Sequence, residues 1–363
     1  MSAQKLGNYF VLTVLLTVFS AAALAQEASV ADLVVAGNNY LGQGDCFTAI
    51  LTFNMVLERE PGNVDAHLGR GRALFCEGAV ARAAEEFRQV ISSDPDNMSG
   101  YVMLARMYLE QYQSSPSESA GRLDDAIAIL NDAERIDRSY PPLYNMRGLI
   151  QLERADLEGA RSSFETAIEL SSGQDVPNSE QAQYHIHAGV VYRELGQPEQ
   201  ALTSFRRAIT LNPTSAAARN YLGSALKQLD RCDESIFELR QAVSLSQNFV
   251  DANANLGVAL FDCGEEAEAE RWLRRAVELN PVAYPGLYTY LARAYLSQGR
   301  HDEAIDNASR AALLPPSSAE AWYWLGQAYQ ARGGANDASN ARDAYQNALE
   351  RDPGYALAQE ALN

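Results

Sequence analysis

The sequence predicts an all-α fold, a solenoid of stacked antiparallel helix pairs, and three observations lead to it. Small and large residues recur with a period near 34 residues along most of the 363-residue chain. Alanine is abundant and β-branched residues are sparse, which favours helix over strand. Proline recurs near the end of many periods, where its ring and its missing N–H end a helix. Because one helix pair cannot bury its apolar face alone, neighbouring pairs must stack.

The first residues differ in composition from the rest of the chain. One positive charge, from Lys5, precedes the apolar run YFVLTVLLTVF, and the small residues of SAAALAQ follow it. The run is short for a membrane span, which needs about 20 apolar residues. Residues 1–25 are therefore predicted to be a cleavable signal peptide, with Ala23-Leu24-Ala25 as the recognised end. The alternative is an uncleaved leader that anchors the protein to the outer face of the membrane.

The period divides the rest of the chain, residues 26–363, into nine units. In the fifth unit, Gly189 and Ala201 are the small residues at the eighth and twentieth positions, and Tyr192 and Phe205 are large residues that follow them. The small residues let the two helices of a pair approach closely, and the large ones fill the remaining space. The units span about 30–63, 64–97, 98–140, 141–174, 182–215, 216–249, 250–283, 285–318 and 319–355, and residues 356–363 are expected to form a capping helix.

Three insertions interrupt the period. Residues 111–122 lengthen the turn inside the third unit, residues 171–180 separate the fourth unit from the fifth, and residues 331–340 lengthen the ninth. Connecting segments of this composition run over protein surfaces, so all three are expected to be surface excursions. The insertion at 171–180 is also expected to act as a mild hinge within one continuous array.

This pattern resembles the tetratricopeptide repeat family over roughly residues 30–355. The stretch AWYWLGQAYQ in the ninth unit comes closest to the family's W-x2-L-G-x2-Y pattern. The resemblance implies a right-handed superhelical solenoid in which the first helix of every unit lines a concave surface. It also implies a protein or peptide partner, and it assigns positions 2, 5, 6, 9, 12 and 13 of each unit to the concave surface.

The side chains at the sixth position are small or apolar in the first half of the array and become aromatic and polar in the second. Aromatic rings supply contact area, and Asn and Gln pair with the backbone of an extended peptide. Arginines one repeat apart are suited to holding carboxylates. The alternative is that these are ordinary surface residues with partners inside the protein. The candidate groove residues are Asn38, Arg72, Arg106, His187, Asn220, Tyr221, Asn255, Tyr290, Arg293, Tyr323, Trp324 and Gln327.

Features of an enzyme or of a nucleic-acid-binding protein are lacking in the sequence. The formal net charge of −18 repels phosphate backbones, so nucleic acid is not an expected partner. No glycine-rich phosphate loop or G-x-S-x-G pattern occurs. His185 and His187 are two residues apart on a predicted helix and face opposite sides of it, whereas two zinc ligands on one helix are three or four residues apart. We therefore expect no catalytic residues, no metal and no cofactor.

The four cysteines fall at related positions in the repeats. Cys46 and Cys232 begin the second helices of the first and sixth units, and Cys76 and Cys263 end the first helices of the second and seventh. The second helix of one unit packs antiparallel to the first helix of the next, so each pair should meet at one edge of the solenoid. We expect disulfides Cys46–Cys76 and Cys232–Cys263, formed in an oxidising compartment. The alternative is four unpaired core residues.

These observations favour a non-catalytic exported scaffold, periplasmic or extracellular, that binds peptide segments or protein surfaces along its concave groove. Cell-envelope assembly is one setting for such a protein. One alternative is a carbohydrate-binding or enzymatic protein with its site near the aromatic C-terminal repeats. Another is a structural array that associates with itself. No later stretch is apolar and long enough to span a bilayer once the leader is removed.

Overall fold

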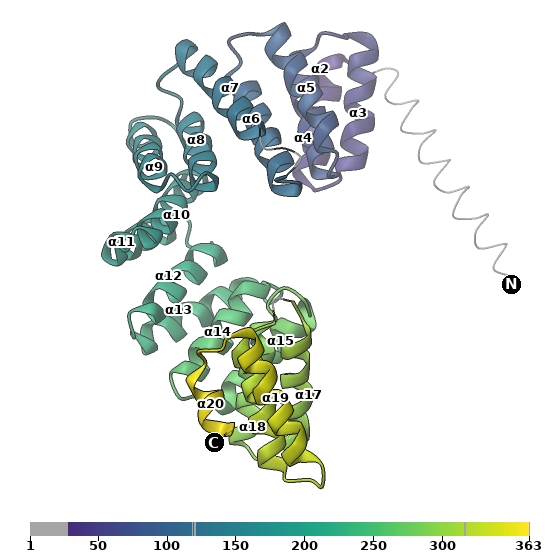
Figure 1. Cartoon of the computed structure of the whole chain (residues 1–363). Helices are drawn as coiled ribbons and strands as arrows, with labels where there is room; N and C mark the ends of the chain where they lie inside the picture. The colour runs from purple at the N-terminus through teal and green to yellow at the C-terminus, as the bar shows by residue number, and fades with distance from the viewer. Residues whose placement is uncertain (1–27, 118, 120, 316, 363) are drawn as a thin grey trace, which may run out of the picture. The chain divides into compact units, whose positions relative to one another are not determined.

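The computed structural model describes residues 28–117, 119, 121–315 and 317–362, and the predicted signal peptide lies outside these ranges. Throughout this described part, the secondary structure consists of helices joined by turns (Figure 1). The all-α prediction is therefore confirmed. Among the described helices, none has the length and apolar character that crossing a membrane would require.

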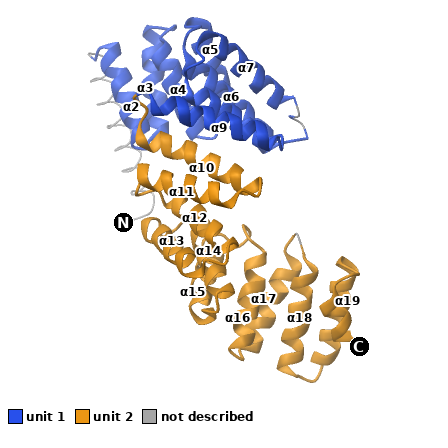
Figure 2. Cartoon of the chain, turned by 90° about the vertical axis from the view of Figure 1, so that its left-hand side faces the viewer, with its two compact units in different colours: residues 1–174 blue, residues 175–363 orange. Residues whose placement is uncertain are grey.

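The chain divides into two compact units, residues 1–174 and residues 175–363 (Figure 2). The division falls inside the insertion at 171–180, where α9 ends at Ser172 and α10 begins at Asn178. The helices of the first unit are α2 (Val30–Gly42), α3 (Cys46–Arg59), α4 (Val64–Cys76), α5 (Val80–Ser93), α6 (Met98–Ser114), α7 (Arg122–Ile136), α8 (Pro141–Glu153) and α9 (Leu157–Ser172).

The second unit continues the same alternation of first and second helices. Its helices are α10 (Asn178–Glu194), α11 (Pro198–Leu211), α12 (Ala216–Gln228), α13 (Cys232–Leu245), α14 (Val250–Asp262), α15 (Glu266–Leu279), α16 (Gly286–Ser297), α17 (His301–Leu313), α18 (Ala319–Arg332), α19 (Asp337–Arg351) and α20 (Ala356–Leu362). The last helix, α20, packs against α19 and buries Ala358 completely.

Within each unit, the helices pack in the order in which they follow one another. Each first helix packs on the second helix of its own pair, as α14 does on α15, and each second helix packs on the next first helix, as α13 does on α14. Neighbouring first helices also contact each other: α12 contacts α14, and α14 contacts α16. Elements approach most closely on the inner side of a curved stack, so the first helices of the second unit line its inner surface.

Glycines facing a ring explain the spacing of small and large residues. Phe53 of α3 is completely buried between Gly37 of α2 and Gly69 of α4. A Cβ atom at Gly37 would lie 2.7 Å from the ring, and one at Gly69 would overlap it. The same arrangement recurs where Gly189 faces Phe205. Small residues are therefore required at these positions because a large ring from the second helix occupies the space.

The turn between the first two repeats shows how local sequence ends one helix and starts the next. Pro61 follows the end of α3 at Arg59, where a proline cannot continue the helical hydrogen bonds. The side-chain oxygen of Asn63 then accepts a hydrogen bond of 2.9 Å from the backbone N–H of Ala66, which caps the N-terminus of α4.

The insertions differ in part from the surface loops that composition predicts. Residues 111–114 continue α6 to Ser114, and residues 337–340 belong to α19. Helix extension satisfies the backbone N–H and C=O groups of these residues, which an irregular loop would leave to solvent. The connection between α18 and α19 therefore spans only residues 333–336.

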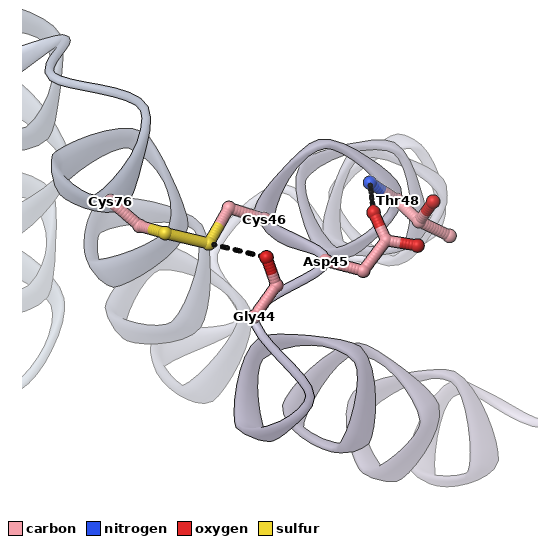
Figure 3. The surroundings of a disulfide bond; sticks show 5 residues. All are labelled: Gly44, Asp45, Cys46, Thr48 and Cys76. Carbon is pink, nitrogen blue, oxygen red and sulfur yellow. Dashed lines mark hydrogen bonds between the residues drawn. A yellow bond between two sulfur atoms is a disulfide. The ribbon is translucent and has the colours of Figure 1, made fainter. Parts of the chain in front are cut away.

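Two disulfides join neighbouring repeats at the predicted places. Cys46, the first residue of α3, is bonded to Cys76, the last residue of α4, with their Cα atoms 6.2 Å apart (Figure 3). Cys232, the first residue of α13, is bonded to Cys263 after the end of α14, with a Cα separation of 5.9 Å. In Figure 3 the Cys46 sulfur also contacts the Gly44 carbonyl oxygen at 3.5 Å.

Candidate functional site

A hollow of about 450 Å³ opens on the inner surface of the second unit. It is bordered by α12, α14, α16 and the segment that precedes α16, with one side chain from the end of α10. Four of the sequence-predicted groove residues meet here. The polar and aromatic residues that line the hollow are Arg193, Asn220, Tyr221, Ser224, Asp251, Asn255, Tyr284 and Tyr290.

Two asparagines from successive repeats pair within this hollow. The side-chain amide of Asn255 donates a hydrogen bond of 2.9 Å to the side-chain oxygen of Asn220. Asn220 is buried, whereas Asn255 is half-buried. An amide side chain offers two N–H donors and an oxygen that can accept twice, so this single bond leaves hydrogen-bonding capacity at both residues. The pair therefore places amide groups where a backbone lying in the hollow can reach them.

Tyrosines stand around the asparagine pair, held by aromatic contacts. The Tyr221 ring stacks on Phe205 with centroids 5.6 Å apart and planes 12° apart. The Tyr290 ring meets Phe261 edge-on, with centroids 5.4 Å apart. Both rings are thus fixed in orientation before any ligand arrives, which limits the entropy lost on binding.

Tyr284 comes from the segment before α16, and 40% of it is exposed. Its hydroxyl donates a hydrogen bond of 2.7 Å to Asp251 Oδ1. Burial, together with this carboxylate, raises the pKa of Tyr284 to about 12. Burial also raises the pKa of Tyr290. Both phenols are therefore neutral at physiological pH, and the hollow presents hydroxyl groups to a ligand.

Arg293 continues the aromatic surface from α16 toward α18. Its guanidinium carbon lies 5.5 Å from the ring centroid of Tyr290, 5.0 Å from that of Trp324 and 4.7 Å from that of Phe261. A carboxylate oxygen of Glu320 is 3.7 Å from the guanidinium. Cation–π contacts of this kind hold a cation in place without removing its charge. Tyr290, Arg293 and Trp324 consequently form one continuous surface.

Two predicted groove residues of the ninth repeat, Tyr323 and Gln327, make contacts within the protein. The ring of Tyr323 packs against Tyr345 of α19 and against Tyr355, each with a centroid separation of 5.8 Å. Gln327 donates a hydrogen bond of 2.9 Å to the Tyr345 hydroxyl. These contacts hold α19 and the C-terminal segment to α18, so they give both side chains a structural role.

His187 is half-buried in α10 and is not among the residues that line the hollow. Burial lowers its pKa to about 4. Burial, with a smaller effect from the positive charge of Arg207, lowers the pKa of His185 to about 4 as well. Both imidazoles are neutral at physiological pH.

The predicted residues of the first unit are Asn38, Arg72 and Arg106, and all three are exposed. The Arg106 guanidinium lies 4.7 Å from the ring centroid of Phe75 and 3.8 Å from Glu110. A carboxylate site at Arg72 and Arg106 stays a prediction.

Some residues of the hollow were missed by sequence reasoning. Asp251 and Arg193 fall at the second and twelfth positions of their repeats, which face inward in the resembled family, so reading those positions would have identified them. Tyr284 lies between two repeats and has no repeat position. Only the path of the chain between α15 and α16 brings it to the hollow.

Metal-binding clusters are also absent from the part of the chain that the structure describes: no group of three or more His, Cys, Asp or Glu side chains there is arranged to hold a metal ion. The strongly shifted pKa of Asp337, about 2, results from hydrogen bonds from Arg332 and the Gly334 N–H. This interaction closes the turn between α18 and α19. It lies away from the hollow and has a structural explanation.

Comparison with known proteins gives the same classification along most of the chain. Models described as tetratricopeptide repeat or TPR repeat match residues 34–98, 77–141, 141–174, 189–230, 254–280, 292–333 and 320–355. Superkiller complex protein 3 of Mus musculus is 27% identical over 252 residues, which cover 67% of this chain and 15% of that protein. The chain thus spans less than a sixth of the length of this curated relative.

Solved structures share the fold at low sequence identity. The APC/C hetero-tetramer Cut9-Hcn1 matches with a TM-score of 0.59 and 18% identity, over 87% of this chain and 58% of the other. The pilF protein of Pseudomonas aeruginosa matches with a TM-score of 0.53 and 21% identity, over 62% of this chain and 97% of the other. The chain therefore belongs to the tetratricopeptide repeat family, whose stacked helix pairs are suited to protein–protein interaction.

Proposed function

We propose that this protein is an exported, non-catalytic scaffold that binds an extended peptide segment of a partner protein on the inner surface of its second unit. The observation that carries the proposal is the Asn220–Asn255 pair inside a hollow of about 450 Å³. An extended peptide carries one N–H and one C=O on each residue other than proline, and amide side chains complement both groups.

The shape of the surface fits a peptide better than a small polar molecule. From the hollow, the aromatic surface continues through Tyr290 and Arg293 to Trp324. A chain that lies across it would pair with the asparagines at one end and pack apolar side chains on rings at the other. Rings held by their neighbours contribute contact area without a large entropic cost.

Export rests on two features that are independent of the groove. The first 25 residues have the composition of a signal peptide, and the four cysteines are joined in two disulfides. Disulfides persist in oxidising compartments and are rare where thiols are kept reduced. A periplasmic or extracellular location accounts for both features.

Selection from a library of unbiased peptides displayed on phage tests the binding function directly. The mature wild-type protein should enrich peptides that then bind in solution by calorimetry. Binding should slow amide hydrogen exchange in α12, α14 and α16. The double variant Tyr284→Ala/Tyr290→Ala should weaken binding about tenfold or more, because two ring contacts are lost.

Phe47→Ala is a matched control, since it removes an aromatic ring that is 64% exposed on α3 of the first unit. This variant should bind the selected peptides as the wild type does. Enriched peptides whose affinity does not change in the Tyr284→Ala/Tyr290→Ala variant would show that the inner surface of the second unit is not the binding site.

A further inference from the structure

A second and larger hollow, of about 730 Å³, lies on the other side of α14. It is bordered by the second helices α13 and α15, with Asn253 of α14 between them. Asn253 and Asn255 are two residues apart, about 200° around the helix, so they face opposite sides of α14. We call this hollow the α13–α15 groove. It is separate from the inner surface that carries the proposed peptide site.

Arginines dominate one wall of the α13–α15 groove. Arg274 and Arg275 come three and four residues after Arg271, so both are neighbours of Arg271 on the face of α15 that borders the groove. Arg240 of α13 lies on the opposite wall. In a chain with a net charge of −18, four guanidinium groups gather here, and Arg240 is already paired with Glu268 at 2.8 Å.

The two carboxylates that line the groove, Glu270 and Glu278, make only long contacts with the arginines of α15. Glu270 is engaged by Arg300 of the next repeat, at 3.1 Å to both of its oxygens, and lies 3.9 Å from Arg274. Glu278 lies 3.7 Å from Arg274 and 3.9 Å from Arg275, beyond hydrogen-bonding distance. Arg274 therefore contacts Glu270 and Glu278 loosely, and Arg275 contacts Glu278 loosely while it donates a hydrogen bond of 2.7 Å to the side-chain oxygen of Asn248.

Arg271 has an aromatic neighbour rather than an ionic one. Its guanidinium carbon lies 4.7 Å from the ring centroid of Trp272, and no ion pair to Arg271 occurs among the residues that the structure describes. Stacking on an indole ring restricts the guanidinium while leaving its N–H donors available. The groove thus holds a positioned cation that has no anionic partner in the described part of the chain.

Asn253 adds an unfulfilled acceptor to the same groove. It is completely buried, and its side-chain amide donates to the carbonyl oxygens of Gln247 and Phe249 at 3.1 and 2.8 Å. Its side-chain oxygen has no hydrogen-bond partner among the described residues. A buried acceptor of this kind is costly unless a donor reaches it.

We propose that the α13–α15 groove binds an extended acidic segment of a partner protein, with carboxylates at alternate positions. Arg271 and Arg275 are about one helical turn apart, a rise of roughly 6 Å along α15. Alternate residues of an extended strand are separated by about 6.7 Å and point the same way. An acidic residue followed two positions later by another therefore matches this pair of guanidinium groups, each of which can hold a carboxylate bidentately.

Charge also makes the groove selective. The acidic surface elsewhere on the protein repels an acidic segment, whereas the arginines of the groove attract it. This difference in electrostatic potential favours binding of the segment in the groove over binding elsewhere. This proposal does not depend on the inner surface, and the two sites can be occupied by two segments of one partner.

Fluorescence anisotropy with a labelled, terminally blocked peptide of alternating Glu and Ala tests the proposal on the mature protein. The peptide should bind at low ionic strength and weaken by about tenfold or more at about 0.15 M salt. A peptide with Gln in place of Glu should not bind. A peptide of the same composition with its Glu residues contiguous should bind more weakly than the alternating one.

The triple variant Arg271→Gln/Arg274→Gln/Arg275→Gln should lose binding of the alternating peptide. Three arginines on other second helices, two exposed and one half-buried, form the matched control with the same change in net charge when they are changed together as Arg135→Gln/Arg161→Gln/Arg310→Gln. If the groove triple is unstable, Arg271→Gln alone should weaken binding several-fold, because Arg271 takes no part in an ion pair among the described residues.

Three results would overturn the proposal. Equal loss of binding in both triple variants would show that the peptide responds to the net charge of the protein and not to the α13–α15 groove. Binding of the Gln peptide with unchanged affinity would exclude recognition of carboxylates. Binding to vesicles of anionic lipid that the groove triple abolishes, without binding of the Glu peptide, would assign the groove to a membrane surface instead. The Tyr284→Ala/Tyr290→Ala variant should keep the affinity for the alternating peptide, which separates this test from that of the inner surface.

Discussion

Asn255 of α14 donates a hydrogen bond of 2.9 Å from its side-chain amide to the side-chain oxygen of Asn220 in α12. The two residues belong to successive repeats, and neighbouring first helices in this unit touch each other. The bond therefore ties two repeats together at the place where the hollow on the inner surface is lined by polar groups. It links the stability of the stack to the chemistry of the proposed binding site.

Replacing either Asn220 or Asn255 should lower both the free energy of unfolding and the affinity for the peptide. Asn255→Ala leaves the buried Asn220 oxygen without its donor, so the free energy of unfolding should fall by about 1 kcal/mol. In a double-mutant cycle measured by urea denaturation, Asn220→Ala and Asn255→Ala should show a coupling energy of about 1 kcal/mol. Strictly additive effects would mean that the bond contributes nothing. Asn39→Ala, at an exposed position of α2, is the control and should change stability little.

A methyl group at Gly189 should be poorly tolerated. A Cβ atom there would lie 2.5 Å from Cε1 of Phe205, a ring that is completely buried. Gly189→Ala should therefore lower the free energy of unfolding by about 1–3 kcal/mol, through overpacking. Gly286→Ala is the matched control, because nothing lies within 4 Å of a Cβ atom at this first residue of α16. Equal urea midpoints for the two variants would contradict the packing argument.

The disulfides should be formed in protein recovered from its own compartment. Non-reducing peptide mapping by mass spectrometry should find Cys46 linked to Cys76 and Cys232 linked to Cys263, and free thiols there would reject the assignment. Each bond closes a loop of about 30 residues. Removing one pair, as in Cys232→Ser/Cys263→Ser, should lower the free energy of unfolding by roughly 3–4 kcal/mol in the chain-entropy model.

Two half-buried histidines, His185 and His187, should make the protein less stable in mild acid. In the folded state the pKa values of His185 and His187 are about 4, against 6.5 for an ordinary histidine, because burial disfavours the charged form. As the pH falls below 6.5, the unfolded chain takes up protons that the folded chain does not, so stability decreases until about pH 4.

Because each pKa unit is worth about 1.4 kcal/mol, the loss from this pair between pH 7 and pH 4 should be on the order of 3–6 kcal/mol, the lower end applying where solvent screens the partly exposed His185. Melting temperatures measured across this range should fall for the wild type. They should fall less for His185→Gln/His187→Gln, which has no imidazole to protonate at these positions. An identical slope for both proteins would show that the two histidines are not protected from protonation.

The repeat pattern predicts the parts of this structure that depend on helical spacing. A glycine at the eighth position and a ring at the twenty-fourth must face each other once two helices pair, as Gly189 and Phe205 do. The cysteine pairing follows in the same way, because Cys46 begins one helix and Cys76 ends the helix beside it. Such contacts are set by the position of a residue along a regular helix.

Spacing also identifies which side chains face the inner surface, but not which of them remain accessible there. Tyr323 and Gln327 have inward positions, yet both make contacts inside the protein. Tyr323 packs against Tyr345 and Tyr355, and Gln327 donates a hydrogen bond to the Tyr345 hydroxyl. Tyr355 is the last residue of the ninth unit, and none of the inward repeat positions describes it. Tyr284 reaches the hollow for a related reason, since it comes from a connecting segment.

The periodicity of the sequence therefore predicts helix pairing, repeat stacking and the two disulfides. Each of these depends on the constant rotation and rise per residue of an α-helix. The contact between Asn220 and Asn255 depends instead on how successive repeats rotate against each other and on side-chain rotamers. The same holds for the place of Arg271 in the α13–α15 groove. Those quantities are set by packing across the whole interface between repeats. Only the folded structure brings together the polar groups that make either site.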